Sequence, residues 1–340
     1  MRACIYGAGA MGTVLGAYIA AKGKQIDLIN RNESHVAALK EKGAHVTGTV
    51  DFTVKVTALT PAEMTGKYDV VFLMTKQRQN AETVSFLKDY LSDNGVICTT
   101  QNGLPEFSVA SVVGEEKCLG CAISWGATFI GGGEAMLTSS PDKLTFALGS
   151  AFTDKPDPAK INAVKSYLEC MGEVTVDGNF IGARWSKMIM NATFSSLSAI
   201  SGLTFGEIAQ NRKTRKAAQV LLKECMDVAA AAGVKPAKMQ GHDIVKAFNY
   251  NNPVKKAVSF ALLPLAMKKH KLLVSSMYYD LIKGRKCDID FVCGEVARQG
   301  AILGVRTPVA DSAIAFAHEI EEGKREISPD NISELTAKRA

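Results

Sequence analysis

Short apolar runs alternate with amphipathic stretches over the first half of the chain. The apolar runs show little internal alternation, which is typical of parallel strands buried on both faces. The stretches between them repeat their apolar positions with the period of an α-helix. The runs that predict strands are 2–6, 25–29, 69–74 and 95–100, and the stretches that predict helices are 13–21, 33–42 and 79–91. This order predicts an α/β fold with a doubly wound sheet.

The pattern changes in two further places. Residues near 44–57 are extended, and residues 116–149 alternate β-forming residues with glycine, which predicts antiparallel strands that complete the sheet. A loop at 153–158 and a helix at 159–171 follow. From about residue 179 we expect only helices, at 181–200, 211–232, 241–250, 254–272, 277–283, 288–303 and 308–321. We therefore predict an α/β domain at 1–178, an all-α domain at 179–325 and a polar tail at 326–340.

A glycine-rich turn stands between the first predicted strand and the first predicted helix. Its spacing is G-x-G-x-x-G, and in that setting it indicates a Rossmann-type dinucleotide site, whereas the same glycines elsewhere would mark a plain turn. Gly7 permits the bend, Gly9 lets the backbone approach a pyrophosphate, and Gly12 allows close helix packing. The helix N-terminus offers amide groups to the anion. The predicted cofactor-binding residues of this turn are Gly7, Ala8, Gly9, Ala10, Met11 and Gly12.

The end of the second predicted strand indicates which dinucleotide binds. In this fold that strand end meets the adenosine ribose, and an acidic residue there favours NAD. Asp27 lies three residues too early, and Asn30 and Arg31 occupy the end. A guanidinium suits a 2′-phosphate, so we predict NADPH as the cofactor, unless Arg31 is only a solvated loop charge.

Polar residues follow the next two predicted strands. Lys76 comes after the strand at 69–74, and Asn102 follows the strand at 95–100. Ligands of open α/β sheets bind beyond the carboxyl ends of the strands. Lys76 is therefore a candidate for the cofactor site and Asn102 for contact with cofactor or substrate, although Asn102-Gly103 also has ordinary turn chemistry.

The first helix of the second domain carries a polar stripe. Lys187, Asn191 and Ser195 recur at intervals of four residues in an otherwise apolar segment, which places them on one helix face. Lys187 either reaches out to solvent or points into a polar cleft, and its polar neighbours favour the cleft. Asp288 lies where a helix N-cap or first-turn acid is expected, and capping is the simpler interpretation.

Composition adds several exclusions. The chain has 340 residues, 47% of them hydrophobic, and a net charge of +6 without a dense basic block, so nucleic acid is not an expected partner. We expect no metal site, because Cys118 and Cys121 in a strand point to opposite faces. We read the eight cysteines as reduced.

We find neither a signal peptide nor a membrane-spanning run, so we predict a cytoplasmic protein. The apolar stripe at 257–267 is expected to be buried, as core or as a dimer surface, and a homodimer is a further prediction.

Together these features resemble the ketopantoate reductase (2-dehydropantoate 2-reductase) family. The resemblance covers most of the chain and implies a Rossmann domain followed by a helical domain, with the active site in the cleft between them. Its markers, in chain order, are Gly7 to Gly12, Arg31, Thr75-Lys76, Asn102-Gly103, Trp185 to Met188 with Asn191, Ser275 to Met277, Asp288 to Asp290, and Gly304 to Pro308.

The resemblance also implies roles for individual residues. Lys187 matches the catalytic acid of the family, and Asn102, Asn191 and Ser276 match substrate contacts. Arg31 and Lys76 match residues that bind the phosphate end of NADPH and line the mouth of the site.

The sequence departs from the family at four other positions. Asp288 stands where the family has a catalytic glutamate, and Ser195 replaces a second helix asparagine. Leu273 and Cys293 each replace a further asparagine. We keep Asp288 as a catalytic candidate and Ser195 as a substrate-binding candidate.

Three functions are consistent with this pattern. The first is NADPH-dependent reduction of 2-dehydropantoate to pantoate, a step of pantothenate and coenzyme A biosynthesis. The second is an NADPH-dependent reductase of another 2-keto acid, or of an imine as in opine-type dehydrogenases. The third is a dinucleotide-binding sensor without turnover, against which the joint presence of Lys187 and Asn191 argues.

Overall fold

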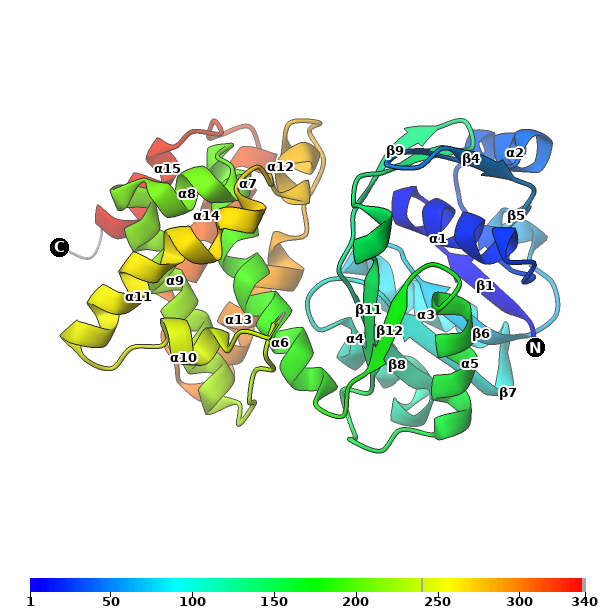
Figure 1. Ribbon diagram of the computed structural model, residues 1–340, viewed down its shortest axis with the longest axis horizontal. Helices are drawn as coiled ribbons and strands as arrows, with labels where there is room; N and C mark the ends of the chain where they lie inside the picture. Colours follow the sequence, from blue (N-terminus) through cyan, green and yellow to red (C-terminus); the bar gives the residue numbers. More distant parts are fainter. Residues whose placement is uncertain (240, 338–340) are drawn as a thin grey trace. The chain divides into compact units, whose positions relative to one another are not determined.

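The computed structural model describes residues 1–239 and 241–337. The chain folds into two compact units (Figure 1). Unit 1 consists of Met1–Gln101 and Pro105–Phe180, and unit 2 of Asn102–Leu104 and the chain from Ile181 onward. Unit 1 contains both strands and helices, whereas the regular elements in the described part of unit 2 are helices. The predicted α/β domain followed by an all-α domain is confirmed.

Unit 1 is built on an eight-stranded sheet with the order β12-β11-β8-β7-β6-β1-β2-β5. Neighbouring strands are parallel except for β8 and β11, which are antiparallel. The strands, in sheet order, are β12 (Glu173–Val176), β11 (Thr145–Gly149), β8 (Cys118–Ile123), β7 (Leu91–Thr99), β6 (Tyr68–Leu73), β1 (Ala3–Tyr6), β2 (Asp27–Ile29) and β5 (Thr57–Leu59). The short edge strand β12 was not predicted, because its four residues are mostly exposed and carry no buried run.

Helices cover both faces of this sheet, as a doubly wound fold requires. One apolar core joins the sheet to α1 (Ala10–Ala21), α2 (Glu33–Lys42) and α5 (Pro158–Leu168), and a second core joins it to α3 (Asn80–Lys88) and α4 (Pro105–Val113). Cys121 belongs to the first core and Cys118 to the second. The prediction that these two side chains point to opposite faces of a strand is confirmed.

The prediction for residues 116–149 is confirmed for β8 and β11, which are antiparallel neighbours in the main sheet, and wrong for β9 and β10, which belong to a second sheet of four strands. Its order is β4-β3-β10-β9, so β9 and β10 do not complete the main sheet. β10 pairs in parallel with β3, which lies far away in the sequence. Alternation along a strand shows that a strand forms but not which strand it pairs with. The bounds are β3 (Ala44–Gly48), β4 (Phe52–Val54), β9 (Ala127–Gly131) and β10 (Glu134–Leu137).

Unit 2 packs its helices around a single apolar core. Leu104 belongs to this core, which explains why the short segment Asn102–Leu104 is part of unit 2. The helices are α6 (Phe180–Met190), the π-helical turn η5 (Asn191–Ser195), α7 (Ser196–Ser201), α8 (Phe205–Gln210), α9 (Arg212–Ala231), α10 (Ile244–Phe248), α11 (Pro253–Ala266), α12 (Ser276–Leu281), α13 (Ile289–Leu303), α14 (Pro308–Glu321) and α15 (Asp330–Ala337).

Three parts of unit 2 differ from the sequence prediction, the first of which is the helix α8, which was not predicted. Residues 330–337 of the predicted polar tail form α15, whose Ile332 and Leu335 are buried in the core, while 338–340 lie outside the described residues. In α11, Leu263 is buried but Leu265 is 67% exposed, so the stripe at 257–267 is not buried as a whole. Across the described residues, we find no helix with the length and apolarity that crossing a membrane would need.

Candidate functional site: a dinucleotide turn and a polar helix stripe

The four central strands of the main sheet end at the same level. Tyr6 of β1 pairs with Ile29 of β2 and with Leu73 of β6, and Leu73 pairs with Thr99 of β7. The loops that follow these four residues therefore start from one edge of the sheet. They carry the glycine turn, Arg31, Lys76 and Asn102. This is the edge at which ligands bind in open α/β sheets.

The three glycines of the turn meet different surroundings. Gly7 has a φ of +107°, and a Cβ there would lie 2.7 Å from the backbone nitrogen of Thr75. A Cβ on Gly12 would lie 2.6 Å from the carbonyl oxygen of Gly7 and 2.9 Å from Ile5. Both positions are therefore closed to larger residues by the protein itself.

Gly9 is different, because a Cβ there would meet nothing within 4 Å. Gly9 is also the N-cap of α1, which has neither a side-chain cap nor an acidic residue in its first turn. An uncapped helix N-terminus beside open space fits the phosphate of a dinucleotide. The turn therefore has the geometry that such a cofactor needs.

The end of β2 separates Asp27 from Arg31. The Asp27 carboxylate accepts hydrogen bonds from Arg2 at 2.8 Å and from the Tyr68 hydroxyl at 2.8 Å, at the start of the strand. The guanidinium of Arg31 lies past the strand end and donates to the side-chain oxygen of Gln79 at 3.0 Å. Asp27 is thus engaged by Arg2 and Tyr68 at the start of β2, away from the end of that strand.

A buried polar network supports the loops after β6 and β7. The Gln101 amide donates to the Thr75 carbonyl at 2.7 Å and to Asn80 at 2.8 Å, and Asn80 donates back to Gln101 at 3.0 Å. Gln101 and Asn80 are both buried. They fix the backbone on either side of Lys76 and just before Asn102. Sequence reasoning missed both residues, although Gln101 directly precedes the predicted Asn102.

The polar stripe of unit 2 lies on one continuous helix formed by α6, η5 and α7. Lys187, Asn191 and Ser195 are half-buried, while most residues between them are buried. The predicted shared face is therefore real. In a regular α-helix each step of four residues drifts by about 40°. The wider π turn at Asn191–Ser195 offsets part of that drift, and such turns occur frequently at functional sites.

The candidate Ser276 is tied to this same helix. Ser275 is the N-cap of α12, and its backbone nitrogen donates to the Ser198 hydroxyl of α7 at 3.1 Å. The exposed Ser276 thus starts its helix one residue from a contact with the helix that bears the stripe. Leu273, the departure three residues earlier, is half-exposed, and its carbonyl accepts from Phe205 of α8.

Asp288 occupies the N-cap position of α13, but its side chain makes no capping hydrogen bond. The simpler interpretation, in which the Asp288 carboxylate caps the helix, is therefore wrong. The flanking residues hold the loop through α14: the Cys287 amide donates to Glu321 at 2.8 Å, and Asp290 pairs with His318 at 2.8 Å.

Cys293, the fourth departure, is fully buried in the core of unit 2. Burial raises the pKa of its thiol to about 12. No disulfide joins the eight cysteines, all of which lie in the described residues. Cys293 therefore acts as a core residue with an un-ionised thiol.

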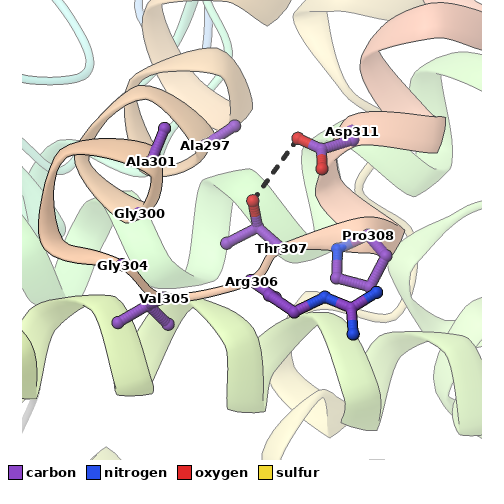
Figure 2. Close-up of a pocket in the computed structure, with 9 residues that line it drawn as sticks. All are labelled: Ala297, Gly300, Ala301, Gly304, Val305, Arg306, Thr307, Pro308 and Asp311. Atoms are coloured by element: carbon purple, nitrogen blue, oxygen red, sulfur yellow. Dashed lines mark hydrogen bonds between the residues drawn. The ribbon is translucent and has the colours of Figure 1, made fainter.

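The segment Gly304 to Pro308 lines a separate pocket of about 360 Å³ between α13 and α14 (Figure 2). Thr307 donates to Asp311 there at 3.4 Å. At the start of α14, the buried carboxylate of Glu224 accepts from the amides of Val309 and Ala310. Glu224 thus caps α14. These contacts give the segment from Gly304 to Pro308 a structural role in connecting α13 to α14. None of the predicted site residues lines this pocket.

The predicted residues therefore fall into two groups. The glycine turn, Arg31 and Lys76 belong to unit 1. Asn102 belongs to unit 2 together with Lys187, Asn191, Ser195, Ser276 and Asp288. The sheet topology and the turn in unit 1 define a protein with a Rossmann-type dinucleotide-binding domain.

Comparison with known families identifies the relatives of this chain. Residues 3–150 match the family model "Ketopantoate reductase PanE/ApbA", and residues 179–321 match "Ketopantoate reductase PanE/ApbA C terminal". The chain belongs to the ketopantoate reductase family. It is 27% identical over 323 residues to a 2-dehydropantoate 2-reductase of Streptococcus pyogenes, covering 93% of this chain and 97% of that protein.

Solved structures share the fold over the whole length. A PanE/ApbA family ketopantoate reductase from Ralstonia eutropha JMP134 has a TM-score of 0.78 at 23% identity, covering 96% of this chain and 100% of that one. D-mandelate dehydrogenase in complex with NADH and anilino(oxo)acetate has a TM-score of 0.78 at 22% identity, covering 95% and 99%.

Proposed function

We propose that this chain catalyses the NADPH-dependent reduction of 2-dehydropantoate to pantoate. The observation that carries the proposal is the stripe of Lys187, Asn191 and Ser195, a half-buried polar face on a helix whose other residues are mostly buried. Partial burial of an ammonium group costs free energy of folding, so a lysine among hydrogen-bonding side chains at such a position indicates a role in binding or catalysis. The family assignment over both parts of the chain supports the same reaction.

The cofactor site is proposed for unit 1. The amides of Ala10, Met11 and Gly12 would bind the pyrophosphate, and Gly9 leaves room for it. Arg31 would pair with the 2′-phosphate that distinguishes NADPH from NADH, and Lys76 would add positive charge at the same edge. When bound, NADPH supplies the hydride that reduces the ketone carbon.

The chemistry of the substrate is proposed for side chains of unit 2. Asn102, Asn191, Ser195 and Ser276 would hold the keto acid by hydrogen bonds. The ammonium of Lys187 would donate to the ketone oxygen and give it a proton as negative charge develops there. The resulting neutral amine would recover its proton from solvent. Asp288 would orient the ammonium or a substrate hydroxyl.

A second candidate function is the reduction of another 2-keto acid, or of an imine. Two observations favour it. Leu273 is apolar and half-exposed, and Cys293 is buried in the core. Neither residue offers the polar contact that the resemblance leads us to expect. A substrate with a more apolar side chain would suit this site better than one with an additional hydroxyl.

NADPH oxidation, followed by absorbance with purified protein, tests the proposal. The panel holds ketopantoate and several other 2-keto acids, each with and without an amine. Turnover restricted to ketopantoate is the expected result. Rapid oxidation with a different acid, or only with an amine present, would support the second candidate. A homodimer and a cytoplasmic location stay predictions.

A further inference from the structure

A buried imidazole connects the second sheet of unit 1 to the dinucleotide turn. His35, in the first turn of α2, is only 1% exposed. Its Nδ1 lies 3.2 Å from the backbone nitrogen of Gly133, in the turn between β9 and β10. Its Nε2 lies 3.1 Å from the hydroxyl of Thr13 in α1. The Thr13 hydroxyl in turn lies 3.1 Å from the carbonyl oxygen of Ala8.

The chemistry of the groups fixes the direction of each bond. A backbone amide can only donate, so the Gly133 N–H donates to His35 and Nδ1 carries no proton. A neutral imidazole then carries its proton on Nε2, which donates to Thr13. Burial lowers the pKa of His35, which favours this neutral form. The Thr13 hydroxyl is left to donate to the Ala8 carbonyl, so three bonds run in one direction toward the turn.

The Ala8 carbonyl is the group at which this chain of bonds ends. It also accepts from the Asn30 side chain at 2.6 Å. The Gly9 N–H of the same peptide unit donates to the Gly7 carbonyl at 2.8 Å, so hydrogen bonds on both of its sides set the orientation of this peptide. If this peptide rotated, its carbonyl oxygen could face the pyrophosphate and repel it.

We propose that His35 and Thr13 are positioning residues of the dinucleotide site, which hold the Ala8 carbonyl turned inward so that the turn presents amides to the pyrophosphate. The inference rests on the proposed dinucleotide function. Both NADPH and NADH contain the pyrophosphate. Loss of this support should therefore raise the dissociation constants of both cofactors by the same factor. That equality separates it from the role of Arg31, which concerns the 2′-phosphate alone.

The first experiment measures the dissociation constants of NADPH and NADH by fluorescence titration. Thr13→Val removes the hydroxyl and keeps the shape, and Thr13→Ser keeps the hydroxyl. We expect Thr13→Val to raise both constants by roughly three- to tenfold, the range for one lost hydrogen bond. Thr13→Ser should restore binding. With saturating NADPH, kcat should stay near the wild-type value, because the cofactor is then fully bound.

A second set of variants tests the two sides of the imidazole. His35→Gln can keep a donor toward Thr13, and His35→Asn can keep an acceptor toward Gly133. We expect His35→Asn to weaken both dinucleotides and His35→Gln to retain much of the affinity. In the double variant of Thr13→Val and His35→Asn, the loss should be close to that of one single variant, because both act on one carbonyl.

The outcomes separate this inference from the proposed function. If the wild type binds both dinucleotides and the Thr13→Val and His35→Asn variants bind them equally well, the positioning role is wrong and the proposed function stands. Additive losses in the double variant would also contradict a shared route. A wild type that binds neither dinucleotide would overturn both proposals. A chain that binds them but reduces no keto acid would leave the positioning role intact.

Discussion

The two units build their parts of the candidate site in different ways. In unit 1, six consecutive residues, Gly7 to Gly12, form the glycine turn, and we expect them to act through backbone amides and the absence of side chains. In unit 2 the candidates come from Asn102, the helix at 187–195, Ser276 and Asp288, and they act through their side chains. A site formed by backbone groups can thus be encoded by a short sequence motif, whereas a site formed by side chains draws its residues from distant parts of the chain.

The difference predicts different consequences of mutation. In the glycine turn of unit 1 a substitution should act by steric exclusion and change cofactor binding. In unit 2 a substitution should remove a charge or a hydrogen bond and change the rate. Experiments that separate binding from turnover therefore test whether the two units differ in this way.

The largest effect is expected for Lys187→Ala. Loss of a general acid typically costs 10²- to 10⁴-fold in rate, so we expect kcat to fall by about a thousandfold. The dissociation constant of NADPH should stay unchanged. Lys213→Ala, at an exposed position of α9, is the matched control and should turn over like the wild type. A Lys187→Ala variant with wild-type kcat would show that the catalytic assignment is wrong.

The next largest effect is expected at Gly9. Because a Cβ there meets no protein atom within 4 Å, Gly9→Ala should keep the wild-type melting temperature. The methyl group would occupy the space of the pyrophosphate, so the NADPH dissociation constant should rise by roughly tenfold or more. Gly12→Ala is the contrasting variant, because its Cβ would lie 2.6 Å from the Gly7 carbonyl oxygen. It should destabilise unit 1 by about 1–3 kcal/mol in a denaturant titration. Tight NADPH binding by Gly9→Ala would refute the pyrophosphate site.

Arg31→Ala should distinguish the two nicotinamide cofactors. A charge-assisted contact to the 2′-phosphate is worth about 1.5–3 kcal/mol, so NADPH should bind at least about tenfold more weakly. NADH affinity should change little. Gln79→Ala, which removes the side-chain acceptor of Arg31, should have the same preference with a smaller effect. Equal weakening of both cofactors would contradict the 2′-phosphate role.

The smallest effect concerns the stability of unit 1 in acid. Burial holds the folded-state pKa of His35 below its usual value of 6.5. Above about pH 6.5 the imidazole is neutral in both the folded and the unfolded chain, so its stabilising contacts are complete. As the pH falls from there through the folded-state pKa, the unfolded chain binds a proton first and the free energy of unfolding decreases. Urea unfolding at several pH values should show a shallower decrease for His35→Gln. Parallel curves for the two proteins would contradict this.

Local patterns were sufficient for much of the fold. The central strands and the long helices α9, α13 and α14 follow from apolar runs and helical periods, because those signals lie within each segment. The partner of β10 could not be predicted, since it is the remote strand β3. The helix α15 was also missed, because two buried residues, Ile332 and Leu335, in a mostly polar segment give a weak periodic signal.

The candidate site shows the same limit. The sequence indicated the glycine turn, Arg31 and the polar helix stripe. It did not reveal the network of Asn80 and Gln101, because side chains at positions 80 and 101 meet only after the strands are aligned.

The amino-acid sequence alone was enough to predict most of the strands and helices, the glycine turn and the family to which the chain belongs. These are properties of neighbouring residues or of a series of short motifs, and they need no knowledge of long-range contacts. Only the folded chain shows that His35 is connected to Ala8 through Thr13, that Asn102 belongs to unit 2, and that Asp288 does not cap its helix. Each of these depends on groups far apart along the chain, which only packing brings within hydrogen-bonding distance.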